Sequence, residues 1–241
     1  MKLIVANLKM NKNSVDMSEY LKKLSEEKFS NKIIILPSLS NLFLASIYKN
    51  ENIEYGVQNF FYKDEGSYTG ECNLTMLNGM DIKYALVGHH ERRKQFKESN
   101  ATINKKILYA LEKGVTPILC VGESFGQTKN NLYKAHLKRQ LSLALKGVKI
   151  ADLEKIIIAY EPTYSIGAEN AADLIYVESN IALIKEFINS KSAKTEIIPK
   201  VLYGGSITVE NYEKYLNSEY IDGLLIGRTI LDADNLIKIG K

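Results

Sequence analysis

The sequence contains only two cysteines, Cys72 and Cys120. Two cysteines are too few for a disulfide framework, and their spacing does not match that of a cysteine-based metal site. We therefore expect two reduced thiols. No metal ion or cofactor is indicated by the sequence.

The chain also has no long hydrophobic run. No apolar stretch approaches the length at which a helix can span a bilayer. Residues 1–6 lead directly into a strand-like pattern, without the apolar region and cleavage site of a secretion signal. These features predict a soluble cytoplasmic protein without a membrane partner.

Charge of one sign is not concentrated in any segment. The net charge of +4 arises from 32 basic and 28 acidic residues that are scattered along the chain. No basic tract is interleaved with aromatic residues, and this argues against a nucleic-acid partner. A mild positive excess can steer a small anionic ligand toward a cleft.

No linker, low-complexity segment or shift in composition divides the chain. Its length of 241 residues suits either two small domains or one α/β barrel. Because no boundary is visible, we expect one domain over residues 1–241.

What the chain does contain is an alternation of strand and helix patterns. Amphipathic helical patterns, for instance at residues 17–27 and 173–189, follow short apolar runs rich in β-branched residues. These runs are residues 3–6, 33–36, 55–57, 84–87, 116–121, 156–159, 201–203 and 223–226. Such alternation predicts parallel strands, and eight units of roughly 30 residues match the size of a (β/α)8 barrel.

A doubly wound open sheet would show the same alternation. Residues 7–12, which join the first strand to the first helix, do not form the glycine-rich turn of a dinucleotide-binding fold. We therefore predict the class α/β with a single (β/α)8 barrel. One segment, residues 59–73, is long and irregular for a compact barrel, and we expect it to act as a lid or an interface.

Polar residues stand where several predicted strands end, and in a barrel all these ends meet at one face. Pro162 ends the sixth strand directly after Glu161, which places a carboxylate at a rigid strand tip, as a general base requires. Taken singly, Lys9 is better explained as a surface lysine. The whole group nevertheless provides an electrophile, an acid and a base: Asn7 and Lys9 after the first strand, His89 and Glu91 after the fourth, and Glu161 after the sixth.

Glycines after the last two predicted strands form a separate signal. Two glycines precede Ser206, and Gly227 precedes Arg228. Backbone NH groups at tight turns bind anions, and the loops after the last two strands of such barrels often hold a phosphate. The alternative explanation is that these glycines only close turns and bind no phosphate. Together with Gly167, which lies in the loop behind Glu161, these glycines favour a phosphate site.

Several of these segments resemble the motifs of the triosephosphate isomerase family, from the first predicted strand to the last. The motifs are ANLKMN at residues 6–11, GHHERR at 88–93, AYEP at 159–162, YGGS at 203–206 and DGLLIG at 222–227, with shorter matches at 58–59, 68–71 and 120–123. The resemblance implies a TIM barrel that interconverts dihydroxyacetone phosphate and D-glyceraldehyde 3-phosphate through an enediolate, in glycolysis and gluconeogenesis.

The resemblance also implies a role for each catalytic candidate. Glu161 corresponds to the base, and His89 to the electrophile at the carbonyl. Lys9 corresponds to the positive charge that stabilises the enediolate, with Asn7 assisting. Glu91 corresponds to a residue that supports the site.

Phosphate binding and assembly are implied in the same way. Gly167, Ser206, Gly227 and Arg228 correspond to residues that offer backbone NH groups to the phosphate. The family resemblance further implies a homodimer, in which the loop at Thr69 reaches toward the neighbouring active site. The implied ligand is a small phosphorylated triose.

The sequence departs from the family pattern at a few positions without losing a reacting group. Leu8 stands in place of an aromatic residue, Tyr164 in place of the tryptophan of the lid, and Arg228 in place of a glycine. His90 replaces a serine, and it either donates a hydrogen bond to Glu161 or points away into the helix packing.

Two other functions remain open at this stage. One is a different sugar-phosphate isomerase on the same fold. The other is a phosphate-binding barrel without catalysis that acts as a binding or regulatory protein.

Overall fold

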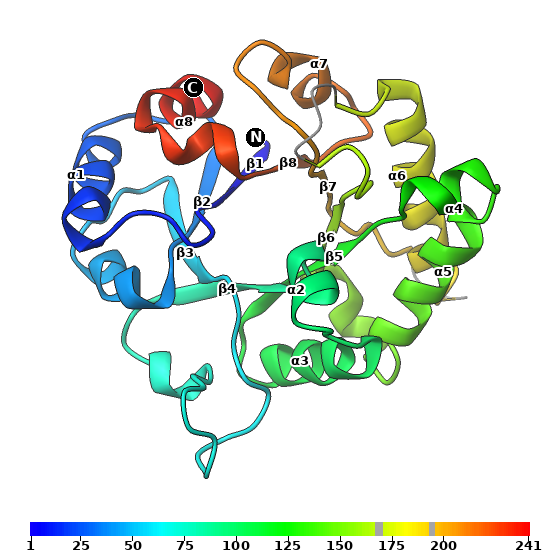
Figure 1. Ribbon diagram of the computed structural model, residues 1–241, viewed down its shortest axis with the longest axis horizontal. Coiled ribbons are helices and arrows are strands. Elements are labelled where there is room, and N and C mark those ends of the chain that lie inside the picture. Colours follow the sequence, from blue (N-terminus) through cyan, green and yellow to red (C-terminus); the bar gives the residue numbers. More distant parts are fainter. Residues whose placement is uncertain (167–170, 193–195) are drawn as a thin grey trace.

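The predicted strands close into one barrel in the computed structural model, which describes residues 1–166, 171–192 and 196–241 (Figure 1). Strands that follow one another in sequence pair side by side, β8 pairs with β1, and all pairs are parallel. The strands are β1 (Leu3–Asn7), β2 (Lys32–Leu36), β3 (Ile53–Val57), β4 (Ile82–Val87), β5 (Thr116–Val121), β6 (Ile157–Tyr160), β7 (Val201–Tyr203) and β8 (Gly223–Ile226). The predicted (β/α)8 class is confirmed.

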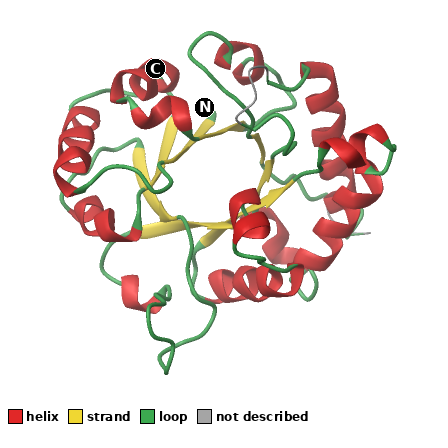
Figure 2. Cartoon of the chain, in the orientation of Figure 1, coloured by secondary structure: helices red, strands yellow, loops and turns green. Residues whose placement is uncertain are grey.

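Helices surround the barrel on its outside (Figure 2). The α-helices are α1 (Ser14–Ser25), α2 (His90–Gln95), α3 (Asn100–Glu112), α4 (Phe125–Lys129), α5 (Tyr133–Ala144), α6 (Leu174–Asn189), α7 (Tyr212–Leu216) and α8 (Ala233–Gly240). Short 3-10 helices are η1 (Leu39–Ser46), η2 (Thr75–Leu77), η3 (Ile150–Lys155) and η4 (Arg228–Leu231). None of the helices in the described ranges is long and apolar enough to cross a membrane.

Side-chain caps fix where the helices expected near residues 17–27 and 173–189 begin. The side chain of Asn13 accepts hydrogen bonds from the first backbone NH groups of α1, and Asp173 does the same for α6. Helix α1 therefore starts three residues before the apolar pattern that predicted it. Its buried face carries Tyr20, Leu21 and Leu24, which pack against the barrel.

The expectation of a helical pattern after every strand is least accurate after β3. Residues 59–73 form a loop that projects from the barrel in Figure 1, where it is cyan, and only the short η2 follows it. The NH of Phe61 donates to the carbonyl oxygen of Cys72 at 2.8 Å and closes the base of the loop. The ring of Phe61 also packs on Tyr68, with 4.6 Å between the ring centroids. Both cysteines of the chain are free thiols, as expected.

The barrel separates two apolar cores. Side chains at alternate strand positions face the helices, and those between them fill the barrel interior. The interior cluster contains Leu3, Val5, Ile34, Leu36, Leu86, Ile118, Cys120, Ile157, Ala159, Leu202 and Leu225. This alternation determines which strand-end residues face the mouth of the barrel.

Candidate active site

Asn7 and Glu161 reach the barrel mouth because they continue the inward-facing rows of their strands. Leu3 and Val5 of β1 lie in the interior core, and Asn7 is the next residue in that row. Ile157 and Ala159 of β6 likewise precede Glu161. Only 4% of Asn7 and 5% of Glu161 are exposed, so both polar groups are enclosed at the floor of the pocket.

Lys9 is held in a backbone conformation that is unfavourable for a residue with a side chain. Its φ of 51° is left-handed, which costs about 1–3 kcal/mol. Asn7 Oδ1 accepts a hydrogen bond from the Lys9 NH at 3.1 Å, and Gln58 Nε2 donates to the Lys9 carbonyl oxygen at 2.9 Å. These two contacts fix the strained turn and direct the ammonium group into the pocket, where it donates to Glu91 Oε1 at 2.7 Å.

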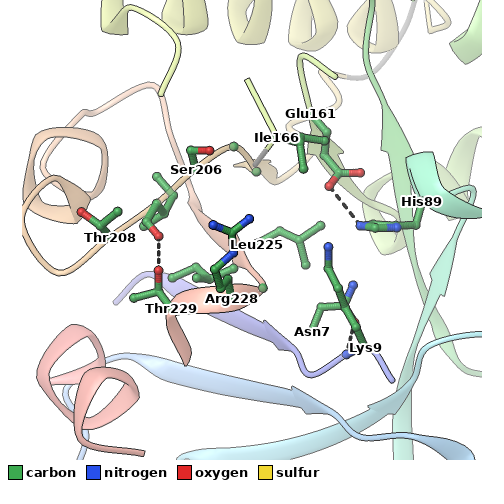
Figure 3. A pocket seen from close by; sticks show the side chains of 15 residues that line it. Asn7, Lys9, His89, Glu161, Ile166, Ser206, Thr208, Leu225, Arg228 and Thr229 are labelled. Atoms are coloured by element: carbon green, nitrogen blue, oxygen red, sulfur yellow. Dashed lines mark hydrogen bonds and ion pairs between the residues drawn. The ribbon is translucent and has the colours of Figure 1, made fainter. Parts of the chain in front are cut away.

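His89 precedes helix α2 and acts as its N-cap. Its Nδ1 accepts the NH of Glu91 at 3.4 Å. We therefore assign the proton of the neutral ring to Nε2, which lies 3.4 Å from Glu161 Oε1. A dashed line joins these two side chains in Figure 3. Gly88 allows this geometry because its φ of 71° is left-handed.

Glu161 is a buried carboxylate between two imidazoles. Besides His89 Nε2, its Oε1 lies 3.9 Å from His90 Nδ1, so His90 faces Glu161 and does not point away from it. That distance is too long for the hydrogen bond that was one of the two expectations for His90. The rings of His89 and His90 lie against each other, with centroids 4.4 Å apart.

The pKa values of the pair reflect their mutual attraction. Burial by itself raises the pKa of Glu161, but the charge of His89 and its hydrogen bond outweigh burial and lower the pKa to about 2. For His89, burial lowers the pKa, and the facing Glu161 carboxylate reverses this and raises it above the ordinary value. For His90, burial prevails and lowers the pKa. Glu161 is therefore ionised at neutral pH.

Glu91 joins Lys9 and His89 without lining the pocket itself. Burial raises the pKa of Glu91, yet the hydrogen bond from Lys9 and the charge of His89 lower it overall. Glu91 is thus an anion that contacts both Lys9 and His89.

The loops after β7 and β8 form the other wall of the pocket. Ser206, Gly227 and Arg228 line it together with residues of β8 and its flanking turns (Figure 3). Ser206 has a φ of 23°, and its hydroxyl donates to the Ser165 carbonyl oxygen at 2.6 Å, which joins this wall to the segment after Glu161. The cavity measures about 170 Å³, a size for a small molecule.

Gly122 is required because the backbone of Glu161 passes very close to it. A side-chain carbon at Gly122 would lie 1.8 Å from the Glu161 carbonyl oxygen. In this position the Glu161 NH donates to the Val121 carbonyl oxygen at 2.8 Å. The backbone of Glu161 therefore stays paired to β5 although β6 has ended.

The pocket brings together most of the residues that the sequence singled out. Thr69 lies apart from them, exposed in the projecting loop. Gly167 lies outside the residues that the structure describes, so its predicted phosphate contact stays a prediction. The residues that line the pocket are Asn7, Lys9, His89, Glu161, Ser206, Gly227 and Arg228.

Sequence reasoning gave no role to Glu123, which is fully buried behind the site. The hydroxyls of Tyr160 and Tyr176 each donate to its Oε1 at 2.9 Å. Burial raises the pKa of Glu123, although these hydrogen bonds act in the opposite direction. Its carbonyl oxygen also accepts the NH and the hydroxyl of Thr163, so Glu123 anchors the chain two residues after Glu161. The sequence signals for Glu123 were its place after the fifth strand and the family motif at residues 120–123.

Comparisons with known proteins agree with this geometry. A family model described as "Triosephosphate isomerase" matches residues 2–241. Proteins named triosephosphate isomerase are similar over their whole length. The one from Aquifex aeolicus is 37% identical over 245 residues, which cover 99% of this chain and 98% of that protein. The one from Dictyoglomus thermophilum is 35% identical over 246 residues, with 100% and 98% covered.

A third relative, from Finegoldia magna, is 35% identical over 244 residues, which cover 98% of this chain and 96% of that protein. Identity at this level over nearly the whole chain, on a closed parallel barrel, is a family relationship and not a shared fold alone. The chain belongs to the triosephosphate isomerase family and is an isomerase.

Proposed function

We propose that the protein interconverts dihydroxyacetone phosphate and D-glyceraldehyde 3-phosphate, in glycolysis and gluconeogenesis, with Glu161 as the base. The observation that carries this proposal is the meeting of Glu161, His89 and Lys9 around one pocket. Glu161 removes the proton next to the carbonyl and returns it to the neighbouring carbon. His89 and Lys9 stabilise the negative oxygen of the enediolate.

His89 and Lys9 are hydrogen-bond donors, and they suit the negative charge that develops on the carbonyl oxygen of the substrate. Proton removal beside a carbonyl moves negative charge onto the oxygen, and preorganised donors in a dry pocket lower the barrier of that step. His89 offers its Nε2 proton and Lys9 its ammonium group, while Asn7 fixes the backbone of Lys9. Glu91 holds the ammonium in place.

Substrate binding requires Glu161 to leave His89. Their polar atoms are 3.4 Å apart, which leaves no space for the reacting carbons between them. The same movement removes the partner that lowers the pKa of Glu161, so its pKa rises and the carboxylate becomes a stronger base when the substrate takes the place of the imidazole.

Ser206, Gly227, Arg228 and Gly167 hold the phosphate in this proposal. The wall after β7 and β8 supports the assignment for the first three, because all three line the cavity in the turns that follow these strands. The exposed guanidinium of Arg228 is directed into the pocket (Figure 3) and adds positive charge near a dianion.

We propose in addition that the protein is a cytoplasmic homodimer, with no nucleic-acid or membrane partner, and that residues 1–241 act as one domain. The projecting loop around Thr69 supports a dimer because a long exposed loop with aromatic residues gains stability when a partner covers it. The pairing of β8 with β1 supports one domain, since the two ends of the chain complete the same barrel.

The test is a coupled assay that follows glyceraldehyde 3-phosphate as it becomes dihydroxyacetone phosphate. We expect turnover by the wild-type protein, and Glu161→Gln should lower kcat by about three orders of magnitude because it removes the base and little volume. Glu186→Gln, on the exposed face of α6, is the control. Binding of the substrate without turnover in wild type would point to a binding protein, and a Glu161→Gln variant that keeps a tenth of kcat would contradict the role of Glu161.

A further inference from the structure

Three potential metal ligands converge where Glu161 faces the two adjacent histidines. One ligand atom each from His89, His90 and Glu161 lies within 4.8 Å of the other two. Two of the separations are 3.4 Å, from Glu161 Oε1 to His89 Nε2, and 3.9 Å, from Glu161 Oε1 to His90 Nδ1. Among the described residues, no other group of histidine, cysteine and acidic side chains is arranged in this way.

Two polar atoms of this cluster are buried without a hydrogen-bond partner. They are His90 Nδ1 and Glu161 Oε2. Buried polar atoms are nearly always paired, because an unpaired one costs about 1–3 kcal/mol. Glu161 is 95% enclosed, since only 5% of it is exposed. The cluster therefore has unused ligand capacity.

The spacing suits a tetrahedral ion. Ligands about 2.0–2.1 Å from zinc lie roughly 3.3 Å from one another in a tetrahedron. The separation between His89 and Glu161 already has this value, and that between His90 and Glu161 is about half an ångström longer. The ligand atoms of His89 and His90 lie within 4.8 Å of each other, so His90 must also move toward His89. Two imidazoles and one carboxylate are a set that zinc uses with a water molecule as the fourth ligand. The pocket that His89 and Glu161 line gives that water access.

The surroundings of His89 also favour a metal. To coordinate through Nε2, its ring must move the proton to Nδ1, and Nδ1 lies 3.4 Å from Glu91 Oε2. Glu91 Oε2 can then accept a hydrogen bond from Nδ1, which replaces the hydrogen bond that Nδ1 accepts from the Glu91 NH in this structure. The result is the carboxylate–histidine arrangement that orients imidazole ligands around metals. The nearest ammonium group, that of Lys9, is neutralised by its ion pair with Glu91.

We propose that His89, His90 and Glu161 bind a divalent transition-metal ion of the zinc class when the pocket holds no triose phosphate, and that the bound ion inhibits the isomerase. The ion occupies the lone pairs of the base and of the electrophile, so neither can act on a substrate. Metal and substrate therefore compete: the metal raises the apparent KM and leaves kcat unchanged at saturating substrate. The inhibition rests on the proposed function, whereas the binding site does not.

Direct binding tests the site without any assay of activity. We would titrate the full-length protein with Co²⁺ and follow visible absorption, and titrate it with Zn²⁺ in a calorimeter, in a Cys72→Ser background that removes the partly exposed thiol. One ion per chain with the intense absorption of four-coordinate cobalt is expected. His90→Ser and His90→Gln should each weaken binding by at least about tenfold, as the loss of a ligand requires.

His136→Ser is the matched control. It removes the only other histidine of the chain, which pairs with Gln127 in α4. Binding by the His90 variants that equals that of wild type, or no binding of either ion below about 1 mM, would overturn the proposal. The affinity limit corresponds to about 4 kcal/mol.

Kinetics then test the consequence. Zn²⁺ should inhibit wild type and His136→Ser equally, and inhibit His90→Ser at concentrations at least about tenfold higher, each measured against its own uninhibited rate. Inhibition that triose phosphate does not relieve would contradict a shared position. If the protein showed no isomerase activity, the proposed function would fail while the cobalt and calorimetric results would still decide the metal site.

Discussion

At the scale of single residues, Glu161 and His89 form one ion pair whose two halves depend on pH in opposite ways. The pKa of His89 is raised above 6.5, so its stabilising effect is complete below that value and is lost as the pH rises through the higher pKa of the folded protein. The pKa of Glu161 falls from 4.5 to about 2, so its effect is complete above 4.5 and is lost on acidification toward 2.

This pair predicts a stability difference that depends on pH. The free energy of unfolding of wild type minus that of Glu161→Gln should be larger at pH 6 than at pH 8.5, because the stabilising effect of the raised His89 pKa is complete below 6.5 and declines above it. Urea unfolding at equal protein concentration measures it. A difference that stays constant between the two pH values would mean that His89 remains neutral beside Glu161 throughout.

A second residue-scale prediction concerns Arg228. Its side chain is exposed at the pocket, where water screens its charge, while its backbone stays in place in any variant that keeps η4. We expect Arg228→Gly to raise KM by less than about tenfold, or 1.4 kcal/mol, and Arg228→Lys to raise it less. Steady-state kinetics measure both. A loss of a hundredfold would show that the guanidinium itself grips the phosphate.

Sequence was sufficient to place some of these residues and not others, for a physical reason. Asn7 and Glu161 follow from the two-residue period of a strand, which continues past the strand end. The contact of His90 with Glu161 depends on how Gly88 turns the chain into α2, and the place of Glu123 depends on the path of the loop after β5. Neither path leaves a periodic signal.

At the scale of elements, the start of α6 is tied to the site by a partly buried hydrogen bond. Tyr176, in the first turn of α6, donates to Glu123 Oε1 at 2.9 Å, and Glu123 in turn holds the backbone after Glu161. The helix therefore shares an anchor with the strand end that carries the base. Removal of the hydroxyl leaves that buried oxygen with one donor, from Tyr160.

We predict that Tyr176→Phe lowers the free energy of unfolding by about 1–2 kcal/mol, the range for a hydrogen bond to a buried polar group. Tyr133→Phe is the matched control, because the ring of Tyr133 packs on Tyr176 with 5.6 Å between centroids, and its hydroxyl has no hydrogen bond among those described. Urea unfolding compares the two. Equal stabilities for both variants would mean that water replaces the lost hydroxyl at Glu123.

The elements themselves were largely predictable. Strands β5, β7 and β8 have the bounds that the sequence predicts. Helix α1 begins earlier than its apolar pattern because the cap Asn13, and not burial, sets its first residue. The segment after β2 forms the 3-10 helix η1, in which Asn41 donates to the Lys12 carbonyl oxygen at 2.8 Å. Such side-chain bonds to distant backbone compete with a regular helix and are not visible in sequence periodicity.

At the scale of the whole molecule, the loop of residues 59–73 projects from the barrel (Figure 1), and a hollow lies beside Lys9. The hollow measures about 190 Å³, and it is lined by Lys9, Met10, Pro37, Ser38, Leu39, Leu42, Val57, Gln58 and Asn59. Met10 is 95% exposed there, which is costly for an apolar side chain in a monomer. The loop that carries Tyr68 and Thr69 extends away from its own barrel (Figure 1), and neither residue lines this hollow.

We therefore predict a homodimer in which Thr69 of each copy lies near Lys9 of the other. Thr69→Arg should place a charge at this contact, weaken the dimer and make specific activity fall on dilution, because Lys9 loses the cover that stabilises its left-handed backbone. Ser142→Arg, on the exposed face of α5, is the control. Sedimentation velocity and activity at matched micromolar concentrations test the prediction. A wild-type protein that sediments as a fully active monomer of 27.2 kDa would contradict it.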